Sequence, residues 1–421
     1  MSNTPEAGLA IAFVSILLTP FALGGLAFIN TGLNRTRSAA HGMLLCLTAA
    51  GIAALAYFAV GFAVQGIPGM PGHTFLMGRR EWDWMGGESF FLRGFNLDTS
   101  SASVGVLFQF FGVALAAMIP VGSSAERWRL GACCASTALL AAWTYPLFAH
   151  WATGTGWLAQ LGFADPGGAS WIDGTGGFTA LAMAWLLGAR RGKFTPQGVP
   201  TAMPGHNAVI VVFGCLLTLP GWFGLNIAGA FLFGGAQPAQ FLSIALNTLL
   251  AGVSSALGAV LVTRLRFGRP DASLSANGWI AGLVASSADA LYVKPAEAIL
   301  IGFIAGVLIV FSVELLELRM KVDDPAGGIS VHTIGGLWGV LAVGIFGRLG
   351  GSTAQFLAQL VGIATLLGFV LPSTFTLNWL LNLVLPQRVA AEAERQGTDL
   401  FELGAGAYPE FVTHREDYFQ R

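Results

Sequence analysis

Asp173 and His332 are the two residues of this chain whose types and spacing most clearly suggest chemistry. They occupy equivalent positions in two similar segments, DPGGASWIDGTGG (residues 165–177) and DPAGGISVHTIGG (residues 324–336), which lie 159 residues apart. One segment carries an acid where the other carries a histidine. A carboxyl group and an imidazole that meet away from water can hold and pass a proton near neutral pH. The pair is therefore a candidate acid–base site, and a buried structural pair is the simpler alternative.

The composition places these residues in a membrane protein. Of 421 residues, 54% are hydrophobic and only 10% are charged, whereas a soluble domain carries about 25% charged residues. The formal net charge is −1 and no basic patch stands out, so we expect no nucleic-acid partner. The four cysteines lie in apolar runs without the spacing of metal ligands, and we predict neither a metal site nor a cofactor.

Eleven apolar runs are long enough to cross a bilayer, because about 20 residues span the hydrocarbon layer as a helix. They cover residues 7–31, 42–65, 102–123, 130–151, 171–189, 207–232, 239–263, 273–292, 296–317, 329–347 and 353–385. We predict an all-α membrane protein with eleven transmembrane helices. Its transmembrane domain is expected to cover residues 1–385, and residues 386–421 are expected to form a cytoplasmic C-terminal tail.

Arginine and lysine indicate how the chain is oriented in the membrane. The loops that follow the odd-numbered runs hold twelve of the 21 basic residues, and the loops that follow the even-numbered runs hold five. Cytoplasmic loops carry an excess of Lys and Arg. We therefore predict a multi-pass protein of the plasma (inner) membrane, with its N-terminus outside and its C-terminus in the cytoplasm.

The two similar segments begin runs 5 and 10, which enter the membrane from opposite sides. This predicts an inverted repeat, residues about 7–189 against about 207–347, with residues 353–385 as an extra helix. Such repeats place the substrate site near the membrane midplane. Asp165 and Asp324 suit helix starts, where a carboxylate caps amide groups. Asp173 and His332 lie roughly 12 Å further along their helices, and ionisable groups at that depth usually line a cavity or path.

Several motifs together resemble the family of ammonium transporters, methylammonium permeases and Rhesus proteins. They are AERWR, YPLFAHW, GWFGLNIAG, KVDDPAGGISVHTIGGLWG and DLFELGAGAY, and the resemblance covers nearly the whole chain. It implies a homotrimer with one narrow pore through each subunit. Two histidines face each other in that family's pore; His332 matches the second, and Asp173 stands in place of the first. Fungal members are similar in carrying an acid there and still conduct.

The resemblance also implies that the pore lining has changed. Thr153 stands in place of a Trp, and Gly229 in place of a Ser. Gly112 and Leu225 stand in place of aromatic residues, while Phe108 keeps the first of two stacked Phe. Large side chains have become smaller, and such losses are costly if the space stays empty. We therefore predict a widened cavity that binds an organic primary amine and is lined by Phe108, Gly112, Thr153, Trp222, Leu225, Asn226 and Gly229.

Two classes of function follow from this altered pore. In the favoured one, Asp173 and His332 are an acid–base pair that joins an amine with nitrite, as in an Amt-like membrane diazotase. Nitrite must be protonated to lose water, and the amine must be a free base to attack. The alternative is a channel for ammonium, methylammonium or another small amine, and a sensor or inert homologue is a third. In the tail, Leu403 and Ala405 replace the His and Glu that the resemblance implies around Gly404, which puts tail-linked control in doubt.

Overall fold

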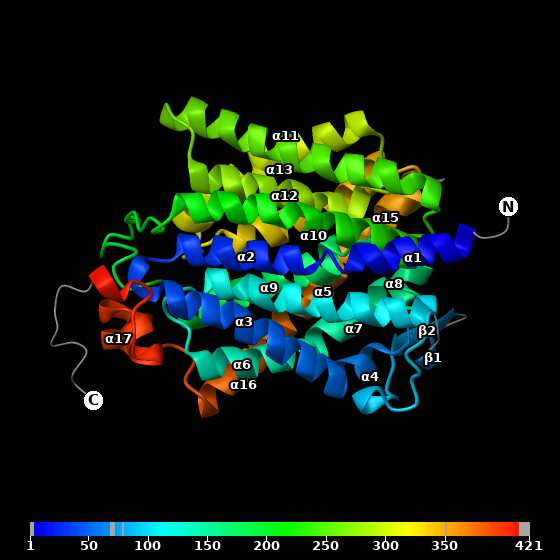
Figure 1. Ribbon diagram of the computed structural model, residues 1–421, viewed down its shortest axis with the longest axis horizontal. Helices are drawn as coiled ribbons and strands as arrows, with labels where there is room; N and C mark the ends of the chain where they lie inside the picture. Colours follow the sequence, from blue (N-terminus) through cyan, green and yellow to red (C-terminus); the bar gives the residue numbers. More distant parts are fainter. Residues whose placement is uncertain (1–3, 68–71, 78–79, 350–351, 412–421) are drawn as a thin grey trace.

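The computed structural model describes residues 4–67, 72–77, 80–349 and 352–411. Long helices run in the same general direction through the molecule (Figure 1). The helix α1 (Thr4–Ile16) and the two-stranded hairpin of β1 (His73–Met77) and β2 (Arg80–Met85) lie at one end, and α17 (Ala391–Gln396) lies at the other. We call these the hairpin end and the tail end.

The elements follow the predicted apolar runs closely. In the first half they are α1, α2 (Pro20–Leu33), η1 (Thr36–Ser38), α3 (Ala39–Ala56), η2 (Tyr57–Gly61), α4 (Phe62–Gln65), β1, β2, η3 (Phe90–Leu92), α5 (Ser101–Ser123), α6 (Leu130–Leu139), η4 (Leu140–Thr144), α7 (Tyr145–Ala152), α8 (Trp157–Gln160), η5 (Ala169–Gly174) and α9 (Thr175–Leu187). Pro20 explains the break between α1 and α2, because proline cannot donate the amide hydrogen bond of a helix interior.

The second half has fewer interruptions. Its elements are α10 (Ala208–Gly234), η6 (Pro238–Gln240), α11 (Phe241–Phe267), α12 (Ala272–Asp289), α13 (Pro295–Glu314), η7 (Leu315–Arg319), η8 (Ile329–Ile334), α14 (Gly335–Phe346), α15 (Ser352–Thr365), η9 (Leu366–Val370), α16 (Leu371–Val384), α17, η10 (Asp399–Leu403) and η11 (Pro409–Phe411). The expected tail thus lies partly in the described chain, while its residues 412–421 lie outside the described residues.

Nine helical stretches within the described residues are long and apolar enough to cross a membrane by length and composition. Two predicted runs are not among these nine, the one formed by η5 and α9 and the one formed by α12. Most side chains of both stretches are buried inside the protein. A helix surrounded by other helices does not face lipid and can carry more polar residues, which explains why these two fall short on hydropathy alone.

The two copies of the repeated motif have the same local geometry. In each, a glycine in the left-handed region follows the aspartate, Gly168 with φ 94° and Gly327 with φ 73°. A π-helical turn comes next, η5 in the first copy and η8 in the second, and each continues into an α-helix. The two π-helical turns contact each other in the core. The predicted all-α membrane fold with two inverted repeats is confirmed, and it brings the two motif copies together.

One described element was not anticipated from the sequence. The strands β1 and β2 pair antiparallel at the hairpin end, with an irregularity between His73 and Thr74. The buried Asp83 carboxylate holds this hairpin on the helices, because it lies 3.1 Å from Nε2 of His150 on α7 and accepts a hydrogen bond from the Thr155 hydroxyl. A short hairpin therefore covers part of the hairpin end in an otherwise helical protein.

Candidate functional site

Asp173 and His332 face each other in the centre of the protein. Oδ1 of Asp173 lies 2.7 Å from Nδ1 of His332, and the two side chains are 1% and 2% exposed. Asp173 belongs to η5 and His332 to η8, so the contact between the two π-helical turns creates the pair. A carboxyl group and an imidazole at this distance can share and exchange a proton.

Asp165 and Asp324 cap the helices that carry the pair. Asp165 accepts hydrogen bonds from the backbone amides of Gly168, Ala169 and Ser170 at 2.6 to 3.2 Å, and from the Ser170 hydroxyl. Burial raises the pKa of Asp165 to about 6, although these hydrogen bonds act in the opposite direction. Asp324 accepts from the Ser123 hydroxyl at 2.7 Å and the Ile329 amide at 2.9 Å. Both carboxyl groups therefore fix the start of a π-helical turn.

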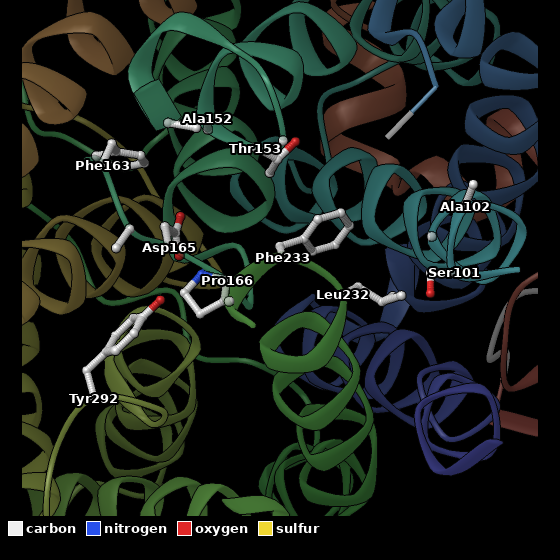
Figure 2. Close-up of a pocket in the computed structure, with 15 residues that line it drawn as sticks. Ser101, Ala102, Ala152, Thr153, Phe163, Asp165, Pro166, Leu232, Phe233 and Tyr292 are labelled. Atoms are coloured by element: carbon white, nitrogen blue, oxygen red, sulfur yellow. The ribbon is translucent and has the colours of Figure 1, made fainter. Parts of the chain in front are cut away.

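A cavity of about 340 Å³ opens at the hairpin end. Its lining residues come from the ends of α5, α7 and α10 and from the loops around Asp165 and Tyr292. Figure 2 shows the Phe233 ring among the lining residues and the Tyr292 hydroxyl directed toward Asp165 and Pro166. Among the described residues that line this cavity, Asp165 is the one with a carboxyl group, and it lies alongside the rings of Phe163, Phe233 and Tyr292. A negative, partly aromatic cavity favours a cation.

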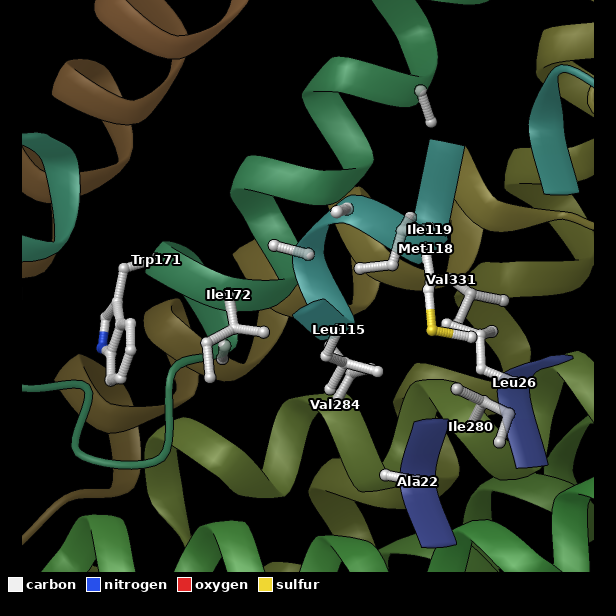
Figure 3. Close-up of a cluster of buried hydrophobic side chains, with 14 of the residues drawn as sticks. Ala22, Leu26, Leu115, Met118, Ile119, Trp171, Ile172, Ile280, Val284 and Val331 are labelled. Carbon is white, nitrogen blue, oxygen red and sulfur yellow. The ribbon is translucent and has the colours of Figure 1, made fainter. Parts of the chain in front are cut away.

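Three aromatic rings lie between this cavity and the acid–base pair. The Trp171 ring centroid lies 5.7 Å from those of both Phe108 and Phe233, and the Phe108 and Phe233 centroids are 5.4 Å apart. Phe233 lines the cavity, whereas Trp171 is fully buried two residues before Asp173. Figure 3 shows Trp171 and Ile172 at one end of a core cluster that extends to Leu26 and Ile280. The described side chains thus close the direct route from the cavity to Asp173.

A second cavity, of about 480 Å³, lies at the tail end. Its lining includes Arg190, Asp324 and Asn277. A small space of about 10 Å³ is lined by both His332 and Asn277, and Asn277 also lines this larger cavity. His332 therefore borders a small space on the tail side, whereas neither residue of the pair lines the hairpin-end cavity.

Comparison with known proteins identifies the group to which the chain belongs. A model of the Ammonium Transporter Family matches residues 10–408. The chain is 35% identical to "Ammonium transporter Amt2" of Archaeoglobus fulgidus, over 95% of this chain and 88% of that protein. It is 30% identical to "Ammonium transporter" of Bacillus subtilis, over 93% and 95% respectively.

The chain belongs to the ammonium transporter family.

Solved structures agree with this assignment. A structure titled "Sensor Amt Protein" has a TM-score of 0.87 and 29% identity, covering 96% of this chain and all of that one. The Mep2 structure from Candida albicans has a TM-score of 0.80 at 23% identity, covering 96% and 91%, and at that identity it supports the fold alone. The resemblance in the sequence motifs is confirmed.

Within this family fold, the predicted widening of the pore is not found at two positions. A Cβ atom added at Gly112 would lie 2.5 Å from the Tyr145 hydroxyl and 3.1 Å from Cδ1 of Ile172. A Cβ atom at Gly229 would collide with the backbone carbonyl of Pro166. Other groups already occupy the space, so these glycines permit close packing and do not line an open volume.

The other predicted lining residues divide between cavity, barrier and helix contacts. Thr153 lines the hairpin-end cavity. Phe108 belongs to the aromatic barrier, by which we mean the packed rings of Phe108, Trp171 and Phe233. Asn226 donates to the hydroxyls of Thr248 and Ser286, and Trp222 donates to the Ser287 hydroxyl. Leu225 is 1% exposed in the core. Four of the seven predicted residues (Trp222, Asn226, Gly112 and Gly229) thus join helices, and Thr153 is the one of the seven that lines the cavity of about 340 Å³.

Three aromatic residues near the site, Trp171, Phe233 and Tyr292, were not predicted from the sequence. Trp171 could have been predicted, because it lies inside the repeated motif and aligns with the much smaller Ser330 of the other copy. Phe233 lies in the last turn of α10 and Tyr292 follows α12. No sequence pattern distinguishes these two residues, and only the folded chain brings them to the cavity.

Proposed function

We propose that this member of the ammonium transporter family binds ammonium or a small alkylammonium ion at the hairpin end and conducts it as the neutral amine. The observation that carries the proposal is the cation-attracting cavity of about 340 Å³ placed before a buried acid–base pair. The similarity to proteins named ammonium transporters supports the same substrate class.

The charge of the ion decides how it crosses. Asp165 and the aromatic rings attract the cation, but the barrier beyond them is apolar, and moving an unpaired ion into such a region is very costly. The alkylammonium or ammonium ion therefore gives up one proton to water in the hairpin-end cavity and passes the barrier as the neutral amine or ammonia. Asp173 and His332 are ionisable side chains beyond the barrier, and we propose that they accept and release a proton during this passage.

Growth on limiting ammonium tests the proposal in a strain that lacks its own ammonium transporters. The wild-type chain is expected to restore growth, and Asp173→Ala and His332→Ala are each expected to reduce uptake at least tenfold. Ser330→Ala is a control for a neighbouring buried residue outside the pair. Equal uptake by the wild type and both pair variants would show that the pair is structural.

A second candidate function is supported by the size of the hairpin-end cavity, which exceeds what ammonium needs. A cavity of this volume is at the lower end of ordinary small-molecule sites. A primary amine on a carbon that keeps one hydrogen could bind there and react with nitrous acid. A nitrogen–nitrogen bond forms, and the carbon hydrogen, both amine hydrogens and the acid hydrogen leave with the two oxygens, giving a diazo compound and two molecules of water. For this reaction the amine and nitrous acid must move past the rings of Phe108 and Trp171 to the pair, where Asp173 would protonate the departing hydroxyl as water and His332 would accept protons from the amine nitrogen.

Isotope-labelled nitrite distinguishes this second function. Purified protein is mixed with nitrogen-15 nitrite and a set of amino acids, and products with a new N–N bond are sought by mass spectrometry. Product that depends on Asp173, without rescue of growth on ammonium, would replace transport by chemistry. Rescue of growth without any product would remove the enzyme hypothesis.

We also propose a trimer with the hairpin end outside and the tail end in the cytoplasm. The support is the position of Arg35, Arg127 and Arg190 in loops near the tail end, together with the rule that cytoplasmic loops are rich in basic residues. Reporter domains fused at either terminus test the orientation, and native mass spectrometry tests the oligomer. Equal exposure of both termini to an external protease would contradict the orientation.

A further inference from the structure

The two copies of the repeated motif, residues 165–177 and 324–336, differ most in side-chain size at one position beside the acid–base pair. The offset that aligns Asp173 with His332 also aligns Trp171 with Ser330. Both residues are buried, Trp171 at 0% exposure and Ser330 at 0%. A large ring therefore lies on one side of the pair, and a small hydroxyl occupies the equivalent place on the other side.

The Trp171 ring is held firmly in its position. Its Nε1 donates a 2.9 Å hydrogen bond to the backbone carbonyl of Asp165, the residue that caps η5. Phe108 and Phe233 pack against the ring, and the Tyr145 ring centroid lies 6.1 Å from that of Trp171. A buried ring with a hydrogen bond at one edge and aromatic neighbours is costly to displace. Trp171 therefore forms a fixed part of the barrier toward the hairpin-end cavity.

On the tail side, His332 borders a small space of about 10 Å³ that Asn277 and Gly328 also line. Asn277 lines the cavity of about 480 Å³ at the tail end as well, so this residue lies between His332 and that cavity. Among the described residues that line the small space there is no Phe, Tyr or Trp ring.

We propose that Trp171 gives the acid–base pair one-sided access, so that Asp173 and His332 exchange protons and small cations with the tail-end cavity and not with the hairpin-end cavity. Trp171 is then also the residue that determines specificity, because a neutral amine from the hairpin-end cavity must pass its ring to reach the pair. The specificity role of Trp171 rests on the proposed function, whereas one-sided access to the acid–base pair can be measured without transport.

Access is tested with a cysteine in place of the acid. Asp173→Cys is prepared in sealed membrane vesicles of each orientation, and Ag+, a small thiol-reactive cation, is added outside. The protein is then denatured and the remaining thiol is counted with a fluorescent maleimide, using the parent chain with its four native cysteines as background. We expect Ag+ to protect the new thiol from the tail side and not from the hairpin side.

Removal of the ring should abolish this asymmetry. Asp173→Cys combined with Trp171→Ala is expected to be protected from both sides, while the combination with Trp171→Phe should retain at least part of the asymmetry. Trp128→Phe is the matched control, because Trp128 is also a buried tryptophan with a hydrogen bond but lies at the tail end. Protection from the hairpin side with Trp171 present, or protection from neither side, would overturn the proposal.

Uptake provides the readout for specificity. Trp171→Ala in the otherwise wild-type chain is expected to raise the ratio of ethylammonium to ammonium uptake about tenfold, and Trp171→Phe should restore most of the discrimination. An unchanged ratio in a Trp171→Ala protein that remains folded, judged by its elution and thermal midpoint in detergent, would end the specificity role. If the wild type transports nothing, the proposed function fails, and the Ag+ result still decides the question of access.

Discussion

Two buried aspartates at helix ends, Asp165 and Asp289, differ in what their carboxyl groups contact. Asp165 lies before η5 and accepts four hydrogen bonds. Asp289 is the last residue of α12, it is 0% exposed, and neither of its oxygens has a hydrogen-bond partner among the described residues. The helix dipole favours a carboxylate at the first position and disfavours it at the second.

This contrast predicts opposite effects of the same substitution. Asp289→Ala should stabilise the protein by about 1–3 kcal/mol, because it removes a buried polar group without partners in the described chain. Asp165→Ala should destabilise it by a similar or larger amount, because four donors would lose their acceptor. Thermal midpoints of the two variants in detergent are the measurement. A lower midpoint for Asp289→Ala would mean that this carboxyl has a partner in the membrane.

The residue scale also shows how far a sequence can predict the site. The encounter of Asp173 with His332 follows from the inverted repeat, since equivalent positions of the two halves meet at the centre. The lining could not be obtained in this way. The sequence reveals that Gly112 is small, but only the fold reveals that the Tyr145 hydroxyl fills the space beside it.

At the scale of elements, the Tyr145 side chain that occupies the space beside Gly112 joins α5 to α7. The Tyr145 hydroxyl donates a 2.7 Å hydrogen bond to Oε1 of Gln109, one turn before Gly112, and all three residues are buried. A methyl group at position 112 would collide with this hydroxyl, and a well-packed core yields to such a group at a cost of about 1–3 kcal/mol. We therefore expect Gly112→Ala to lower the thermal midpoint.

A double-variant cycle checks that the cause is this contact. Tyr145→Phe removes the hydroxyl, so Gly112→Ala should be less harmful in that background than in the wild type. Gly51→Ala on α3 is the control, because a Cβ there meets nothing within 4 Å, and alanine favours a helix by about 1 kcal/mol over glycine. Additive effects of the two changes at positions 112 and 145 would show that the contact is not limiting.

The presence of the membrane helices was predictable from the sequence, whereas the π-helical turns and the short hairpin were not. Apolar runs of sufficient length predict helices because lipid leaves few other backbone structures possible. The π-helical turns η5 and η8 leave no mark in the hydropathy pattern. The hairpin of β1 and β2 is short and lies in a long loop rich in charged and aromatic residues, so its alternation of side chains was easily missed.

At the scale of the whole molecule, a charged cluster joins the two halves at the tail end. Arg190 pairs with Glu126 at 2.9 Å and with both carboxylate oxygens of Asp323 at 2.9 and 3.0 Å, and Glu126 also pairs with Arg35. Burial raises the pKa of Asp323, but the charges of Arg127 and Arg190 outweigh it and hold the pKa at about 2.

This shift predicts a pH dependence of stability. The folded pKa lies below the ordinary value of 3.8, so the stabilisation is complete above about pH 4 and is lost as the pH falls toward 2. Its size at neutral pH is about 2 kcal/mol. Thermal midpoints of the wild type and Asp323→Asn should differ at pH 7, and the difference should shrink as the pH falls from 4 toward 2. A difference that stays constant with pH would assign the stability to packing and not to charge.

The C-terminal tail supplies hydrogen bonds to helices at the tail end, and these bonds form late because the tail is synthesised last. Asp399 accepts hydrogen bonds from the amides of Ala40 and His41 at the start of α3, and the ribosome adds it 358 residues after His41. Gln387 likewise reaches Trp128 long after that tryptophan is made. During synthesis, the first backbone amides of α3 therefore lack the Asp399 carboxylate as their hydrogen-bond acceptor until translation is almost complete. A ribosome that stopped after α16 would release a chain that has the described membrane helices but lacks the contacts of Gln387 and Asp399 at the tail end. Proteases that act on exposed backbone would distinguish this product from the finished protein.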